Sequence, residues 1–123
     1  PRAAGRVVMF LPEGELHEIG LLFGHYLLKR AGHEVLYLGQ TLPREDLIAV
    51  LDRRSTDVVV TSVSSFTGLM DLKHVVAELD RRFPEVSVLV NTRVAASGTE
   101  LPAVRFVTDL HDLVDAVRHQ RRA

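Results

Sequence analysis

The chain has 123 residues, of which 46% are hydrophobic and 25% charged, and its formal net charge is −1. These values suit one globular domain, residues 1–123, with a single modest core. The small net charge gives no electrostatic footprint for nucleic acid, and no apolar run approaches the ~20 residues of a membrane span. Cysteine is absent, which excludes disulfides, thiolate catalysis and Cys-based zinc sites, and we expect a cytoplasmic protein with no membrane partner.

Strand-like and helix-like segments alternate along the chain. Five short apolar or β-branched runs predict strands at 6–11, 34–38, 57–61, 86–90 and 104–107. Apolar residues at spacings of three and four predict helices at 18–30, 43–54, 69–83 and 110–119. The first helix has one wide apolar face, formed by Ile19, Leu22, Phe23, Tyr26 and Leu27.

This alternation predicts a parallel sheet covered by helices on both faces. We therefore expect an α/β, flavodoxin-like (Rossmann-like) three-layer sandwich whose five strands have the order 2-1-3-4-5. In such a sheet the ligand crevice lies beyond the carboxyl ends of the strands. The loops after the first, third and fourth strands, at 13–20, 62–68 and 91–98, should therefore form one site.

The first of these loops holds His17, the only histidine predicted at the carboxyl end of a strand. Imidazole is a ligand for cobalt, iron, zinc or copper, and also a usable general base. The carboxylate of Glu15 could accept a hydrogen bond from its far ring nitrogen and fix its tautomer. A solvated loop histidine beside a surface acid is the alternative. The other histidines are expected in surface or packing roles: His25, His33, His74, His111 and His119.

The remaining crevice candidates each have two interpretations. Gly20 either lets a bulky ligand approach or lets the helix pack closely on the sheet. Ser62 and Ser64 either hydrogen-bond a ligand or cap the following helix. Asn91 and Thr92 are expected to form a turn rather than to contact a ligand.

Several enzyme and signalling classes lack their motifs in this chain. There is no Gly-rich phosphate loop ending in Lys, no three-glycine dinucleotide fingerprint and no Ser-His-Asp set with a nucleophile elbow. A phospho-accepting receiver would need an Asp at the end of the third strand, where the sequence has Val60-Thr61-Ser62. The sequence therefore does not favour these classes.

The run Glu15-Leu16-His17-Glu18-Ile19-Gly20 resembles the Asp-x-His-x-x-Gly motif of cobalamin (vitamin B12)-binding domains. Ser62-Val63-Ser64 falls at the register of that family's Ser-x-Leu, and Asn91-Thr92 at the register of its Gly-Gly pair. The resemblance covers about 6–117. It implies that His17 ligates the cobalt, that Glu15 supports it, and that Ser62, with Ser64, contacts the cofactor's nucleotide tail. Asn91 and Thr92 put side chains where the glycine pair leaves room for that tail, a departure that bears directly on binding.

Within the family, 11–22 together with Tyr37-Leu38-Gly39 looks most like the C-terminal sensory domain of MerR-type transcriptional regulators. That resemblance implies a domain that is not itself an enzyme, adenosyl- or methylcobalamin as cofactor, and contact with DNA only through a domain absent from this chain. Cofactor binding would change its association either with a cap domain or with a second copy, as a homo-oligomer. The first residue is Pro1 rather than Met, and we expect a C-terminal piece of a longer regulator. The alternatives are a corrinoid carrier domain of a methyltransferase or mutase, and a cofactor-free interaction module on the same fold.

Overall fold

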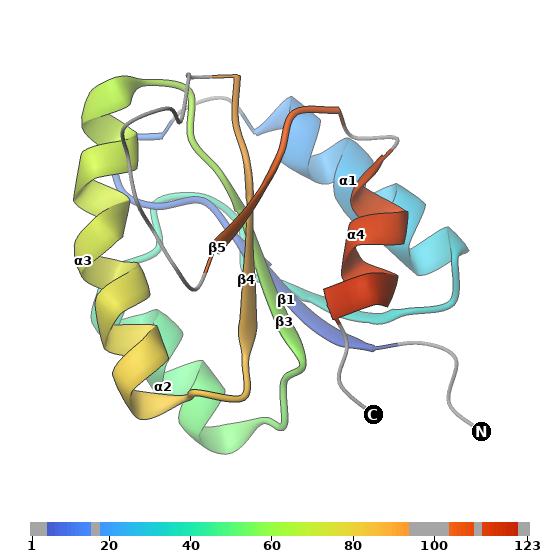
Figure 1. Ribbon diagram of the computed structural model, residues 1–123, viewed down its shortest axis with the longest axis horizontal. Coiled ribbons are helices and arrows are strands. Elements are labelled where there is room, and N and C mark those ends of the chain that lie inside the picture. Colours follow the sequence, from blue (N-terminus) through green and yellow to red (C-terminus); the bar gives the residue numbers. More distant parts are fainter. Residues whose placement is uncertain (1–4, 16–17, 94–103, 110–111, 121–123) are drawn as a thin grey trace.

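The protein is represented by a computed structural model, which describes residues 5–15, 18–93, 104–109 and 112–120, with only the backbone at 119 and 120. A five-stranded sheet of order β2-β1-β3-β4-β5 forms its centre, and every neighbouring pair is parallel (Figure 1). The strands are β1 (Arg6–Phe10), β2 (Glu34–Tyr37), β3 (Val58–Ser62), β4 (Ser87–Asn91) and β5 (Val104–Val107). The predicted fold class and strand order are confirmed.

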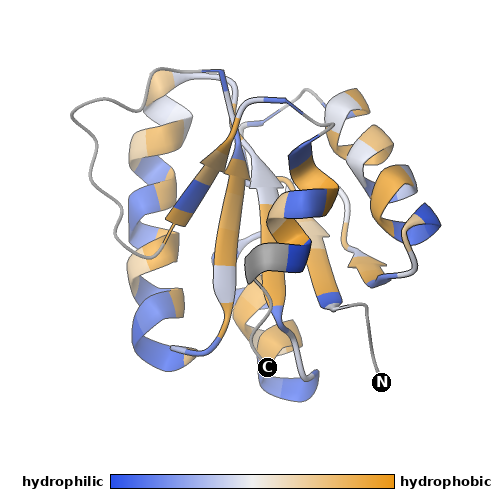
Figure 2. Ribbon diagram, turned by 45° about the vertical axis from the view of Figure 1, so that its right-hand side comes forward, coloured by the Kyte–Doolittle hydropathy of each residue, from blue (hydrophilic) through white to orange (hydrophobic). Residues whose placement is uncertain are grey.

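Helices cover both faces of this sheet (Figure 1). One face carries α1 (Ile19–Arg30) and α4 (Leu113–Gln120), and the other carries α2 (Arg44–Arg53) and α3 (Phe66–Arg82). Strand side chains alternate between the two layers, so neighbours such as Val59 and Val60 enter different cores. Most strand residues are hydrophobic (Figure 2), and they contribute to a core on each side of the sheet. None of the described helices is long and apolar enough to cross a membrane.

Two helices begin three residues away from the predicted start, and the other boundaries differ from the prediction by at most one residue. α3 begins at Phe66 rather than Leu69 because Ser65 caps it, its hydroxyl accepting a hydrogen bond from the Gly68 N–H at 2.9 Å. α4 begins at Leu113 rather than Leu110, which lies outside the described residues together with His111.

The wide apolar face expected on α1 has an unexpected orientation. An apolar stripe at this spacing ordinarily faces the core. Here the buried residues of α1 are Leu21, Gly24 and Leu28, on the other side of the helix. Most of the predicted face is instead exposed: Ile19, Leu22, Phe23 and Tyr26. Both sides of the helix are apolar, so spacing alone did not identify the side that packs on the sheet.

Buried polar groups link neighbouring segments of the sheet. The hydroxyl of Thr61, fully buried in β3, donates to the carbonyl of Phe10 in β1 at 2.7 Å. The Nδ1 atom of buried His33 accepts a hydrogen bond from the Gly5 N–H at 2.9 Å, which agrees with the packing role expected for this histidine. The first of these bonds fixes the end of β1 immediately before the loop that contains Glu15.

Candidate functional site

The carboxyl ends of β3 and β4 bring Ser62 and Asn91 together. The two residues are partners in the β3–β4 register, and the Nδ2 amide of Asn91 donates to the Ser62 hydroxyl at 3.2 Å. Strand alternation puts both side chains on the α1/α4 face, on the side of Val60 and Leu89. Ser62 is buried and Asn91 half-buried. The predicted convergence of the third and fourth strand ends is therefore present, as a closed polar pair.

The neighbouring candidates have different surroundings. Thr92 is buried, and its N–H donates to the Val107 carbonyl at 3.0 Å, continuing the pairing of β4 with β5. Asn91 is the last residue of β4, so the prediction that Asn91 and Thr92 form a turn is wrong. Ser64 is exposed. Because Ser65 is the N-cap of α3, neither Ser62 nor Ser64 has the capping role considered for it.

The loop after β1 directs Glu15 toward the opposite face of the sheet. Gly14 has a φ of +89°, and the Glu15 N–H donates to the Pro12 carbonyl at 3.2 Å, which closes a tight turn. Glu15 is only 6% exposed, and a Cβ added to Gly68 would lie 3.3 Å from its Oε2 atom. Its carboxylate therefore lies at the first turn of α3, where the helix dipole favours negative charge. The expected partnership of Glu15 with His17 stays a prediction, because His17 and Leu16 lie outside the described residues.

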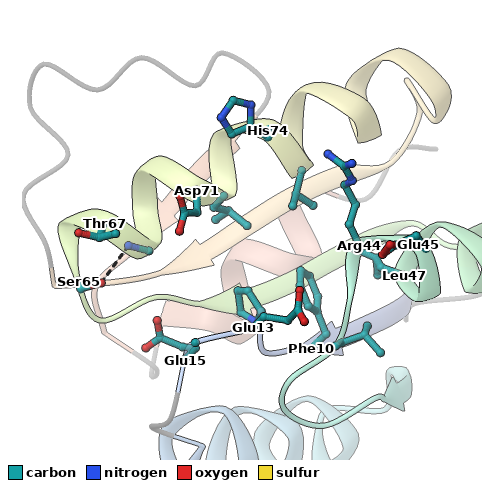
Figure 3. A pocket seen from close by; sticks show the side chains of 16 residues that line it. Phe10, Glu13, Glu15, Arg44, Glu45, Leu47, Ser65, Thr67, Asp71 and His74 are labelled. Atoms are coloured by element: carbon teal, nitrogen blue, oxygen red, sulfur yellow. Dashed lines mark hydrogen bonds between the residues drawn. The ribbon is translucent and has the colours of Figure 1, made fainter.

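A cavity of about 490 Å³ extends from this loop between the start of α2 and the first half of α3 (Figure 3). Its apolar lining includes Phe10, Leu47 and Leu72, and its acidic lining consists of Glu13, Glu15, Glu45 and Asp71. Arg44, which also lines it, is paired with Glu78 at 3.3 Å. The excess of carboxylates favours hydrogen-bond donors over anions such as phosphate. Sequence reasoning missed this cavity because its residues come from three separate segments.

At the start of α1, Glu18 is the N-cap residue, and its Oε2 atom accepts a hydrogen bond from the Tyr37 hydroxyl at 2.6 Å. Burial, and then this carboxylate, raise the pKa of Tyr37 well above its ordinary value. The Tyr37 ring also stacks on His25, with centroids 4.9 Å apart. Ile19 is 84% exposed and Gly20 half-buried. No pattern in the sequence indicated the contact between Glu18 and β2.

The described groups fit a polar ligand at the α1/α4 side of the sheet edge. The Ser62 hydroxyl and the Asn91 amide each offer donors and acceptors. Their mutual bond already uses one donor of Asn91 and one acceptor of Ser62. Within the described ranges, no group of three or more His, Asp or Glu side chains is placed to hold a metal ion. A metal bound at this edge would therefore need a ligand such as His17 or one supplied by a cofactor.

The sheet and its polar strand ends define a ligand-binding domain of the flavodoxin-like type. Residues 5–97 match the family model described as "B12 binding domain", and the chain belongs to this family. The resemblance identified from the sequence is thereby confirmed at the level of the family. Cobalamin is accordingly the cofactor that the family implies for this chain.

Known proteins with similar sequences agree with this membership. The chain is 27% identical over 120 residues to methionine synthase of Mycobacterium leprae, a match that covers 98% of this chain and 10% of that protein. It is 28% identical over 78 residues to the methanol–corrinoid protein of Methanosarcina barkeri, which covers 58% of this chain and 30% of the relative. The chain thus spans a minor part of each relative's length.

The fold has a close counterpart among solved structures. A cobalamin-binding protein from Desulfitobacterium hafniense superposes with a TM-score of 0.86 at 20% sequence identity. The match covers 97% of this chain and 60% of that one. At this identity the likeness shows the shared fold alone.

Proposed function

We propose that this chain binds cobalamin, with His17 as the cobalt ligand, and acts as the sensory domain of a transcriptional regulator. The observation that carries the proposal is the Ser62–Asn91 pair at the carboxyl edge of the sheet, in a chain of the B12 binding family. The pair lies where the family resemblance puts the nucleotide tail. It combines the serine expected to contact that tail with a side chain that stands in for a glycine.

Each residue has a distinct role in this proposal. Cobalamin, when bound, would supply a cobalt centre, and the imidazole of His17 would be the side chain of this chain that ligates it. The Ser62 hydroxyl hydrogen-bonds the nucleotide tail, helped by Ser64. The Asn91 amide first has to leave Ser62, which couples occupancy to the conformation at the ends of β3 and β4.

That coupling favours a sensory role. A ligand shifts an equilibrium only if it interacts differently with two states of the protein, and a nucleotide tail that displaces Asn91 from Ser62 would make that difference. The chain itself does no catalysis in this proposal. DNA would be bound by another domain of the regulator, and adenosylcobalamin, when bound, would make this domain sensitive to light.

A corrinoid carrier domain of a methyltransferase or mutase is the second candidate. It is favoured by the names of the two similar sequences, a methionine synthase and a methanol–corrinoid protein. Methyl transfer from bound methylcobalamin to a partner enzyme would support the carrier and contradict the sensor. Failure to retain any corrinoid would instead leave a cofactor-free interaction module.

A titration in the dark tests cobalamin binding. Hydroxocobalamin and adenosylcobalamin are added separately, visible spectra are recorded, and the protein is desalted to see whether colour is retained. We expect a spectral shift that is lost in His17→Ala and kept in His74→Ala, because His74 is an exposed residue of α3. A shift of equal size in both variants would refute ligation by His17.

A further inference from the structure

Helix α1 carries a strip of large apolar side chains that nothing in the described part of the chain covers. The exposed fractions are 84% for Ile19, 45% for Leu22, 43% for Phe23 and 54% for Tyr26. Their spacing of i, i+3, i+4 and i+7 puts all four on one side of the helix, opposite the buried side. Figure 2 shows hydrophobic residues along the length of this helix. Contiguous exposed apolar surface of this kind marks an interaction site.

The surface of the strip is uneven as well as apolar. A shallow hollow beside it is lined by Leu22, His25, Tyr26, Lys29 and Arg30. The Arg30 guanidinium donates to the Tyr26 hydroxyl at 2.9 Å, and the Phe23 and Tyr26 rings stack with centroids 6.4 Å apart. These contacts hold the two rings in defined positions, so the strip offers a hollow at one end and the projecting side chain of Ile19 at the other.

The charges of α1 are segregated along its length. Glu18 lies at the amino end, and Lys29 and Arg30 lie at the carboxyl end. Glu18 and Lys29 share one flank of the strip, since a separation of eleven residues is close to three helical turns. The carboxylate of Glu18 is held in place by the Tyr37 hydroxyl at 2.6 Å. A helix that packs on this strip should therefore be basic where α1 is acidic, and acidic where α1 is basic.

A second copy of α1 in the antiparallel direction meets this requirement. We propose that the chain forms a symmetric dimer in which α1 packs against α1 of the second copy, around a two-fold axis close to Phe23. Like flanks of two antiparallel helices face each other, so Glu18 of each copy meets the partner's Lys29. Ile19 then enters the hollow beside the partner's Tyr26. A parallel arrangement would put like charges together at both ends.

The proposed interface is small. One helix face of this length buries less than the roughly 1,200 to 2,000 Å² of a standard-size protein interface, and smaller interfaces typically belong to weak complexes. We therefore expect reversible association that depends on protein concentration. Sedimentation analysis of the cofactor-free chain between about 10 µM and 1 mM covers the range in which such complexes dissociate.

The first test removes apolar contact at the centre of the strip. Phe23→Asp should weaken dimerisation at least tenfold, whereas Met70→Asp, at an exposed methionine of α3, should leave it unchanged. Circular dichroism checks that both variants fold. A monomer throughout the concentration range, or a dimer that Phe23→Asp does not affect, would overturn the proposal, and the strip would then belong to contact with another partner.

The second test examines direction through charge. Glu18→Lys alone and Lys29→Glu alone should each weaken dimerisation, and an equimolar mixture of the two variants should recover it, because only mixed dimers restore both attractive pairs. Tyr37→Phe controls for the hydrogen bond that Glu18→Lys removes. Failure of the mixture to recover, while the single variants still fold, would refute the antiparallel arrangement.

A third test uses the absence of cysteine from the chain. Phe23→Cys should form a disulfide-linked dimer under mild oxidation, because residues close to a two-fold axis approach their own counterparts. Ala77→Cys, at an exposed position of α3, should stay largely monomeric. Equal cross-linking of the two variants would indicate random collision and contradict the proposed interface.

Discussion

Replacement of Asn91 by glycine should change stability and cofactor affinity in opposite directions. The substitution removes the 3.2 Å hydrogen bond to Ser62, and such a bond contributes about 0.5 to 1.5 kcal/mol net. Glycine in a strand costs roughly a further 0.5 to 1 kcal/mol. The cofactor-free protein should therefore lose about 1 to 2.5 kcal/mol, or about 4 to 10 °C in melting temperature for a domain of this size.

Cobalamin affinity should increase, because the cofactor's tail no longer has to displace the amide. The hydrogen bond alone corresponds to a gain of about 2- to 13-fold in the binding constant. Asn91→Ala is the matched control, since it removes the same bond without the added freedom of glycine.

Urea titration and scanning calorimetry measure the loss of stability, and a spectroscopic titration in the dark measures the gain in cobalamin affinity. Cobinamide, a corrinoid without the nucleotide tail, should bind the original protein and both variants equally. If Asn91→Gly bound cobalamin no more tightly than the original chain, or if cobinamide gained as much as cobalamin, Asn91 would not obstruct the tail. The proposal that it controls occupancy would then be wrong.

Two further predictions concern stability. Thr61→Val should lower the free energy of unfolding by about 1 to 2 kcal/mol in urea titrations, because it removes a buried 2.7 Å hydrogen bond to the Phe10 carbonyl. The control Thr108→Val, at an exposed site, should change the free energy of unfolding by less than about 0.5 kcal/mol. Equal effects of the two substitutions would contradict this account. Burial, and then Lys29, lower the pKa of His25 below its ordinary 6.5. The unfolded chain therefore binds a proton more readily than the folded one, so stability should fall as the pH drops below 6.5, and His25→Asn should flatten that fall in urea titrations across this range.

Local patterns in the sequence were sufficient to predict the fold. Apolar runs gave the five strands, and the alternation of strands with helices gave a parallel sheet of the correct order. Handedness and short connections leave few ways to arrange such a chain. The same reasoning predicted that the first loop, the end of β3 and the end of β4 meet at one edge of the sheet. The match of residues 5–97 to the B12 binding domain model confirmed the family that the motifs in these segments suggested.

The tertiary structure alone decided how individual side chains are oriented. Glu15 turns toward the amino end of α3, and Asn91 reaches Ser62 across a strand pairing that links residues far apart in the chain. Spacing along α1 identified apolar residues on both sides of the helix, but only packing selected Leu21, Gly24 and Leu28 as the buried side. The physical reason is that periodicity records local geometry, whereas register and the choice of buried face depend on contacts between distant segments.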